Sequence, residues 1–182
     1  MRPRLSLKGR ALQWLAQREH SRIELRRKLM RHARADAQAA ALHAVALATP
    51  GDDQHSVDVA PTLESLHTEV EALLEWLQAH RYLSEERFVE SRIHARSSRF
   101  GNLRIRQELQ QHGLTLSPEL TAGLRHSEHE RASEVRQRKF GDPPATSAER
   151  SRQARFLAGR GFSAEVIWQV LREVGAAGAS ED

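Results

Sequence analysis

Apolar residues recur at steps of three and four along almost the whole chain, and this spacing constrains the fold more than any other feature. The clearest run lies in 63–77, with apolar positions Leu63, Leu66, Val70, Leu73, Leu74 and Leu77. A second run near the C-terminus consists of Val166, Ile167, Val170, Leu171 and Val174. This period places apolar side chains on one face of an α-helix, and the alternation typical of strands is nearly absent. The sequence therefore predicts an all-α protein.

Helix start and stop signals agree with this period. Ser84 precedes two glutamates, and Ser117 precedes a proline, both of which favour a helix start. Gly113 and Gly161 are typical of helix ends. Three further segments match the capping box, in which a Ser or Thr is followed three residues later by Glu: 21–24, 127–130 and 146–149. Together these signals predict about nine helices of roughly 10–17 residues.

Three places can be compared in which a leucine is followed four residues later by a small residue: Leu29–Ala33, Leu109–Gly113 and Leu157–Gly161. The leucines are 80 and 48 residues apart. The segment 33–62 is Ala-rich and then breaks into Pro, Gly, Asp and Ser without sustained periodicity, which is typical of an insertion. Subtracting its 30 residues from 80 leaves 50, close to 48. The sequence therefore predicts an internal repeat with three helices per copy.

The copies are predicted at 1–83, 84–126 and 127–182. The first contains the insertion 33–62, expected to be disordered or loosely helical, and the last ends in a short flexible tail. Stacked units of short helices contact mainly their neighbours. We therefore expect an elongated, curved array of three tandem three-helix repeats, whose long groove suits a polymer better than a small molecule.

Charge is distributed unevenly along the chain. Residues 1–32 carry 10 Lys and Arg against 2 acids, and residues 81–140 carry 12 against 8. Residues 33–80 have one Arg against 8 acids. Two separate basic segments indicate an acidic partner such as nucleic acid or an acidic protein surface.

Several classes of function are disfavoured. The chain has no cysteine, so disulfides, thiolate metal sites and thiol nucleophiles are excluded. His126 and His129 lie three residues apart, but no third ligand follows at a fixed spacing, so we expect no metal. No nucleotide or hydrolase motif occurs, and no apolar run approaches the roughly 18 residues of a membrane span. We expect a cytoplasmic, non-catalytic protein without a cofactor.

Three segments resemble one known family. The run "YLSEERFVESRIHARSSRFGNLRIRQELQQHGL" at 82–114 resembles the signature of RecX, the regulatory protein of the RecA recombinase. "REHSRIELRRKL" at 18–29 and "RQARFLAGRGFSAEVIWQVLREV" at 152–174 resemble its first and last segments, in the same order. Two departures stand out: the insertion 33–62, and Ser84-Glu85-Glu86, where the family often has paired Asp.

The resemblance implies a three-helix repeat fold and a protein that lies in the groove of the RecA filament on single-stranded DNA. There it would limit filament growth and damp ATP hydrolysis, strand exchange and RecA-stimulated repressor cleavage. The implied partners are the RecA filament and single-stranded DNA, reached directly or through the filament. Stacked repeats with capped ends are compatible with a monomer.

Candidate contact residues are arginines. Arg92, Arg96 and Arg99 are spaced i, i+4, i+7 on one helix face, and Arg104 and Arg106 follow. They form either a basic strip for phosphates or a solvated face, and the resemblance favours contact. At the N-terminus, binding and plain solvation are equal alternatives for three further arginines, Arg22, Arg26 and Arg27.

Other residues are assigned to packing. Tyr82, Leu83 and Phe88 are expected to pack the joint between repeats. The ends of second helices are assigned to Gly113, Gly161 and Phe162. The three tryptophans, one per copy, are assigned to the core or the repeat interfaces: Trp14, Trp76 and Trp168.

A different class of function stays open from the residues alone. The basic N-terminal segment resembles a helix-turn-helix over 7–32. In addition, Arg104, Gln107 and Gln111 share an outer helix face. Such side chains can read base edges in duplex DNA. The alternative is therefore a stand-alone helical nucleic-acid-binding protein, such as a transcription regulator.

Overall fold

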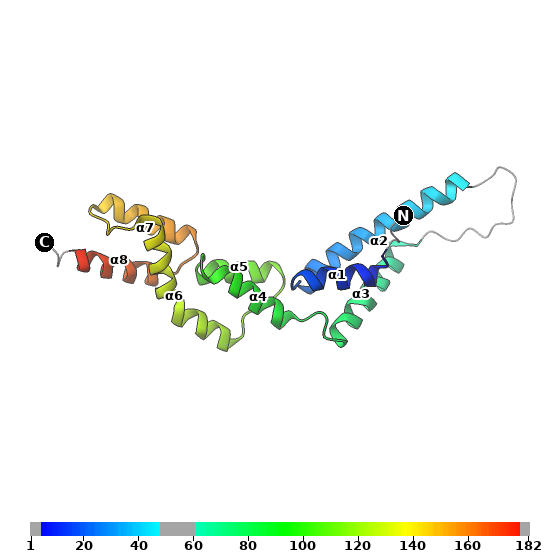
Figure 1. Ribbon diagram of the computed structural model, residues 1–182, viewed down its shortest axis with the longest axis horizontal. Coiled ribbons are helices and arrows are strands. Elements are labelled where there is room, and N and C mark those ends of the chain that lie inside the picture. The colour runs from blue at the N-terminus through cyan, green and yellow to red at the C-terminus, as the bar shows by residue number, and fades with distance from the viewer. Residues whose placement is uncertain (1–4, 48–60, 179–182) are drawn as a thin grey trace. The chain divides into compact units, whose positions relative to one another are not determined.

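The computed structural model describes residues 5–47 and 61–178, and every regular element in this part is a helix. The predicted all-α class is confirmed. The helices are α1 Leu7–Gln17, α2 Arg22–Leu47, α3 Leu63–Ala79, α4 Glu85–Ser97, α5 Asn102–Gln111, α6 Pro118–Phe140, α7 Ser147–Gly159 and α8 Ala164–Gly178 (Figure 1).

The described residues contain eight helices, whereas about nine were predicted. The difference arises because two expected helices form the single helix α6. The capping box at 127–130 does not start a helix: Ser127 lies inside α6, where its hydroxyl donates to the carbonyl of Gly123 at 3.1 Å. Inside a helix, a serine hydroxyl can donate to the carbonyl four residues earlier, so a serine in a capping-box pattern does not always mark a helix start. The length estimate was also too short, since α2 has 26 residues and α6 has 23.

The other predicted caps do start helices. A Ser or Thr oxygen accepts from the backbone N–H three residues later at each of four starts, over 3.1–3.2 Å: Ser21 to Glu24, Ser84 to Arg87, Ser117 to Leu120 and Thr146 to Glu149. The carboxylate of Glu149 also accepts from the N–H of Ala145 at 2.8 Å. Each bond satisfies one of the free donors of a helix N-terminus.

The chain divides within α4 into two compact units, Met1–Phe88 and Val89–Asp182, here called unit 1 and unit 2. Residues 33–47 of the predicted insertion are helical and continue α2, and the rest, apart from 61 and 62, lies outside the described residues. The predicted border between the second and third repeats, at 126/127, falls inside α6. The curved array and the three-repeat division stay predictions.

Unit 1 is built from α1, α2 and α3, with α2 packed against both neighbours (Figure 1). The long α2 contributes Leu25, Leu29 and Ala33 to its core, and Ala37 packs at the edge. Trp14 and Trp76 are partly buried against this core, as predicted. The remaining buried residues are Ala11, Met30, Leu66, Val70, Leu74, Leu77 and Leu83.

A buried histidine, His20, lies in the turn between α1 and α2 and contacts residues of both flanking segments. The Nδ1 of His20 lies 2.9 Å from the carbonyl of Arg18, and its Nε2 lies 2.9 Å from the Nζ of Lys28. Because the carbonyl can only accept and the ammonium can only donate, these contacts require the neutral ring. Burial lowers the pKa of His20, which favours the same neutral form.

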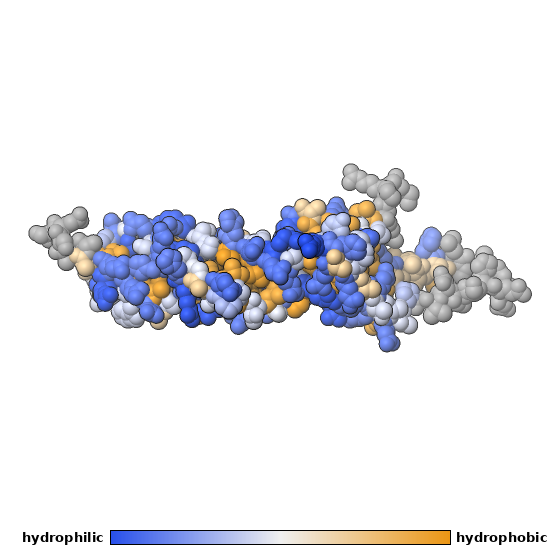
Figure 2. Space-filling model, turned by 90° about the horizontal axis from the view of Figure 1, so that it is seen from below, coloured by the Kyte–Doolittle hydropathy of each residue, from blue (hydrophilic) through white to orange (hydrophobic). Residues whose placement is uncertain are grey.

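The core of unit 2 is formed where α6, α7 and α8 pack together, from Ala132, Val135, Leu157, Phe162, Ile167, Val170 and Leu171. Trp168 is not part of it: this side chain is 66% exposed, so its assignment to packing was wrong. Its neighbours Ile167 and Leu171 face inward, and the helical period turns Trp168 outward. On the face seen in Figure 2, hydrophilic residues predominate and apolar residues gather in separate patches.

Two inter-helix turns of unit 2 bind one another through their backbones. The N–H of Gly101 donates to the carbonyl of Arg160, and the N–H of Leu103 donates to that of Gly161, both at 3.0 Å. The approach is so close that a Cβ on Gly101 would lie 2.2 Å from the carbonyl oxygen of Gly161. Only glycine can therefore occupy position 101 without displacing the α7–α8 turn.

A buried carboxylate from α6 joins the same two turns. Glu128, 4% exposed, accepts from the N–H of Asn102 at 3.0 Å and from the N–H of Ser163 at 3.3 Å. These donors lie at the N-termini of α5 and α8, where a negative charge is favourable. One side chain thus caps two helices from different parts of the chain.

Arg131, one turn further along α6, completes this network. Its guanidinium donates to the side-chain oxygen of Asn102 at 2.6 Å and to the carbonyl of Phe100 at 2.9 Å. Burial lowers the pKa of Arg131, and the charge of Glu128 opposes that effect. The guanidinium stays charged, since arginine titrates far above neutral pH.

The close approach at position 101 predicts that Gly101→Ala destabilises unit 2. The added Cβ overlaps backbone atoms that cannot move without breaking the turn–turn hydrogen bonds, so we expect a loss of about 2 kcal/mol in the free energy of unfolding. Urea denaturation followed by circular dichroism measures it. The control is Gly123→Ala in α6, where nothing lies within 4 Å of the added Cβ, and a gain of about 0.5 kcal/mol is expected. Equal effects of the two substitutions would contradict this account.

The neutral state of His20 predicts that unit 1 loses stability in mild acid. Because its pKa is lower in the folded chain than in the unfolded one, the unfolded chain binds the extra proton first. The contribution of neutral His20 to the free energy of unfolding is complete above about pH 6.5, the pKa of histidine in the unfolded chain. It falls as the pH drops toward the lower pKa of His20 in the folded chain. Unfolding followed by Trp14 and Trp76 fluorescence should show a smaller pH dependence below 6.5 for His20→Gln. An unchanged dependence would show that another group is responsible.

Candidate functional site: basic surfaces of the two units

The most concentrated group of cations in unit 2 surrounds a single aromatic ring. Phe100 follows α4 and is half-buried. Four guanidinium groups lie 5.5–5.8 Å from its ring centroid: Arg96, Arg99, Arg104 and Arg160. Each contact at this distance is a weak cation–π interaction, worth roughly 0.5–1 kcal/mol at an exposed site. We call these five residues the Phe100 cluster.

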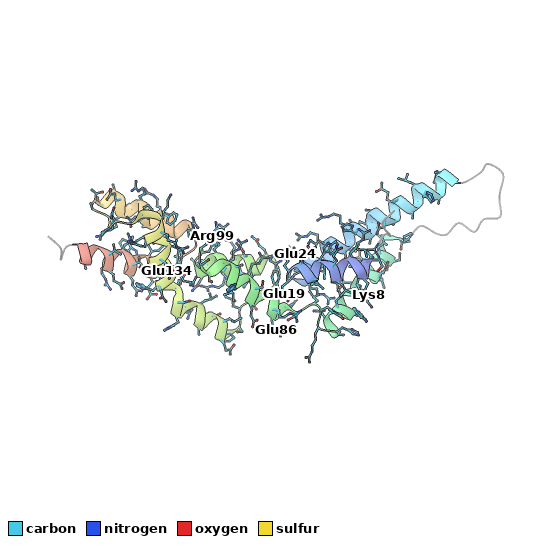
Figure 3. The ribbon with its side chains drawn as sticks, in the orientation of Figure 1. Lys8, Glu19, Glu24, Glu86, Arg99 and Glu134 are labelled. Atoms are coloured by element: carbon cyan, nitrogen blue, oxygen red, sulfur yellow. The ribbon has the colours of Figure 1, made fainter. Side chains whose placement is uncertain are left out.

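Two hollows flank the Phe100 cluster. One, of about 410 Å³, lies between α4 and α5 and is lined by Arg92, Arg96, Arg104, Gln107, Glu108, Gln111 and His112. The other, of about 270 Å³, is lined by Ser98, Arg99, Val135, Arg138, Lys139, Phe156 and Arg160. Arg99 lies where the chain turns from α4 into α5, beside the end of α7 (Figure 3). Both hollows are rich in positive charge.

A glutamate neutralises part of the first hollow. Glu108 lies 2.9 Å from Arg96 and 3.9 Å from Arg104. The i, i+4 pair between Arg104 and Glu108, weighed as the structural alternative, is therefore present alongside the basic strip. This pairing leaves the strip less positive than its arginine count implies.

The structure separates the predicted arginines of this region. Arg92, Arg96 and Arg104 meet at the first hollow, whereas Arg99 lines the second. Arg106 lines neither hollow and is half-buried.

Sequence reasoning missed three cations of the second hollow: Arg138, Lys139 and Arg160. Two lie in the last turn of α6 and one follows α7, about 40 and 60 residues from Arg99. Their only sequence signal is a position near a helix end, which equally suits the helix dipole. The turn–turn contact is what brings them to Phe100.

In unit 1 the predicted arginines divide into two kinds. Arg22 and Arg26 both bind Glu71 of α3, at 2.7 Å and 2.6 Å, and Arg22 also donates to Gln78. These bonds cross from α2 to α3, so both side chains contribute to packing of the unit. Arg27, by contrast, has no ion-pair partner among the described residues.

Arg27 lines a groove between α2 and α3 with a volume of about 620 Å³. The groove is lined by Ile23, Arg26, Arg27, Met30, Arg31, Arg34, Ala35, Gln38 and His67. Apolar side chains of Ile23, Met30 and Ala35 form part of its wall, as those of Val135 and Phe156 do in the second hollow of unit 2. We call it the α2–α3 groove.

The residues predicted at repeat joints occupy varied environments. Leu83, Phe88 and Phe162 are at most 3% exposed. Tyr82 is 48% exposed and stacks on Trp76 with 5.7 Å between ring centroids. The backbone φ angles of Gly113 and Gly161 are +72° and +82°, the left-handed conformation that favours glycine at a helix end.

No group of three His, Asp or Glu side chains within the described residues could hold a metal ion. His129 instead lies 3.0 Å from Glu173. None of the described helices combines the length and apolar character needed to cross a bilayer.

The described residues form an all-α protein with basic surfaces in both units, and the comparisons name its family. The family models for the second and third three-helix domains of RecX match residues 84–115 and 127–171. A regulatory protein RecX of Leptothrix cholodnii is 47% identical, with 94% of this chain and 90% of the relative covered. The regulatory protein RecX of Ralstonia nicotianae is 44% identical, and the match covers 92% of this chain and 87% of the relative. The one of Neisseria meningitidis serogroup B is 31% identical, and the match covers 100% of this chain and 99% of the relative. The chain belongs to the RecX family.

The two kinds of arginine on α2 predict different responses to truncation. Arg22→Ala should lower the free energy of unfolding by about 1 kcal/mol because it removes the bond to Glu71. Arg27→Ala, on the same helix, should change it by less than about 0.5 kcal/mol. A double-mutant cycle with Glu71→Ala tests the assignment by urea denaturation. Additivity of Arg22→Ala and Glu71→Ala would contradict it.

Proposed function

We propose that this protein binds the RecA filament on single-stranded DNA and limits its growth, ATP hydrolysis, recombinase activity and coprotease activity. One observation carries the proposal: RecX proteins match the chain over almost its whole length, and also over almost the whole of theirs. The regulatory name belongs to those relatives. The basic surfaces described above support its extension to this chain.

The Phe100 cluster supports contact with the nucleic-acid component of the filament. Guanidinium groups bind phosphates with two hydrogen bonds each, and an aromatic ring offers a base a stacking face. Phe100 is half-buried, so its role is mainly to hold the guanidinium groups in place. Arg99, Arg138 and Lys139 are exposed and available to an incoming phosphate.

The geometry also supports binding through several weak contacts. The cationic side chains are held by the ring of Phe100 and by backbone carbonyls; Arg138, for example, donates to the carbonyl of Ser98 at 2.6 Å. Side chains that are already ordered lose less conformational entropy on binding. A filament presents many equivalent phosphates, so a small, pre-ordered cationic surface can add to protein–protein contacts along it.

The test is a titration of the full chain into RecA assembled on single-stranded DNA. ATP hydrolysis and filament length should both fall as the protein approaches stoichiometric amounts. Arg99→Glu/Lys139→Glu should weaken the inhibition by about tenfold or more and lower the salt dependence of binding by about two in log–log slope. No change in either quantity with the parent protein, at low and at moderate salt, would refute the proposal.

A matched control distinguishes an effect of the Phe100 cluster from an effect of the net charge of the protein. Arg155→Glu/Arg172→Glu makes the same change in net charge at exposed positions of α7 and α8 that line neither hollow. It should inhibit RecA like the parent. Equal weakening by both double variants would show that bulk charge, not the Phe100 cluster, is responsible.

The alternative of a stand-alone transcription regulator has its own outcome. Arg104, Gln107 and Gln111 do line one hollow, as their shared helix face predicts. Tight binding to one duplex sequence over random duplex, without an effect on RecA, would favour that alternative. Weak, steeply salt-dependent and sequence-independent binding would exclude it.

A further inference from the structure

The α2–α3 groove of unit 1 combines three features that suit a protein ligand. It is a surface hollow of about 620 Å³, it carries arginines that have no ion-pair or hydrogen-bond partner among the described residues, and its helix continues into exposed apolar side chains. We propose that this groove binds an acidic amphipathic helix of a partner protein. The inference goes beyond the filament function and holds whichever protein supplies the helix.

The groove carries arginines that form no ion pair with the rest of the described residues. Of its four arginines, Arg26 is bound to Glu71. Within residues 5–47 and 61–178, no side chain or carbonyl forms an ion pair or hydrogen bond with Arg27, Arg31 or Arg34. These three arginines are spaced i, i+4, i+7, so they share one face of α2. None of the described residues that line the groove is acidic. A ligand with carboxylates along one side would supply the missing partners.

Apolar contacts are available at both ends of the same helix face. Ile23, before the arginines, is 40% exposed and Leu42, after them, is 65% exposed. Val45 is 75% exposed and follows Arg27 by eighteen residues, which is about five full turns at roughly 3.6 residues per turn. Val45 therefore faces the same side as Arg27. An exposed apolar face on an otherwise charged helix is typical of an interaction surface.

Among the described residues, no core contact involves the part of α2 beyond Ala37. After Ala37, which packs on the core of unit 1, residues 40–46 are exposed on all sides. Alanine-rich sequence has a high helix propensity, so this segment can be helical without burial. It extends the groove by about 10–14 Å at roughly 1.5 Å per residue. The partner helix can thus be longer than the groove proper.

Single-stranded nucleic acid fits this surface less well than it fits unit 2. Proteins that bind it combine cations with aromatic rings on which the bases stack. No aromatic ring lines the α2–α3 groove other than the imidazole of His67, which already contacts Arg26 at 3.5 Å. Ile23, Met30 and the exposed Leu42 offer nothing to a phosphate, whereas they suit the apolar stripe of a helix.

A second copy of this chain is also a poorer occupant. Closed dimers pair the same surface of both subunits. Such pairing would bring Arg27, Arg31 and Arg34 against their own copies, and like charges at contact distance repel. A partner of opposite charge avoids that repulsion.

The experiment measures binding of labelled peptides to the full-length protein by fluorescence anisotropy. The probe is an acetylated and amidated peptide of about 16 residues, or roughly 24 Å of helix, with Leu at i, i+4, i+7 and i+11 and Glu on both flanks of that stripe. A shuffled peptide of identical composition lacks the stripe. An oligo-dT strand tests nucleic acid. Binding of the amphipathic probe, at least tenfold tighter than binding of the shuffled one, supports the proposal.

Variants locate the site on the protein. Arg31→Glu/Arg34→Glu should weaken binding of the amphipathic probe by about tenfold or more, and Leu42→Ser/Val45→Ser should weaken it by several-fold. The control Arg155→Glu/Arg172→Glu carries the same charge change in unit 2 and should bind like the parent. Circular dichroism checks that each variant is folded; all substituted positions are exposed.

Four results would overturn the proposal. One is that the amphipathic probe fails to bind. Another is that the shuffled peptide binds equally well, which would show that only charge matters. Oligo-dT binds and is lost with Arg31→Glu/Arg34→Glu, so that the groove takes nucleic acid. Sedimentation shows self-association that the same variant abolishes, so that the occupant is a second copy. Because RecA inhibition is read in a separate titration, failure here leaves the filament proposal intact.

Discussion

The backbone contact between the α4–α5 turn and the α7–α8 turn is the interaction on which unit 2 depends. Two N–H···O bonds of 3.0 Å join the turns, and the carboxylate of Glu128 caps the helices that leave both of them. A buried carboxylate is costly unless its oxygens are satisfied. Here, N–H groups at two helix N-termini supply both donors and favourable dipoles. The contact and its cap therefore stabilise each other.

The same contact builds the basic surface. Arg160 lies in the second turn and Phe100 in the first, so joining the turns places a guanidinium that follows α7 near a ring that follows α4. The continuous α6 then carries Arg138 and Lys139 to the same hollow. Glu128 and Arg131, which bind Asn102 from the same helix, fix the position of the last turn that presents these two cations.

Unit 1 shows how a fold sorts identical side chains. Arg22, Arg26 and Arg27 lie within six positions of one helix, yet only the first two reach Glu71 on α3. The difference is angular: α3 packs on one side of α2, and Arg27 points past it into the groove. Paired arginines stabilise the unit, and unpaired ones remain available to a ligand. Net charge alone conveys neither role.

The sequence by itself determined the helical class, most helix starts and the glycine ends, because period, capping side chains and left-handed glycines act within a few residues of the backbone they govern. It also determined membership of the family through ordered segments. It could not decide that α6 is one helix, since Ser127 can cap a helix or bond back inside one. Nor could it place Trp168 outside the core or separate Arg22 from Arg27. Those outcomes depend on which faces other helices cover, and only the tertiary structure decides that.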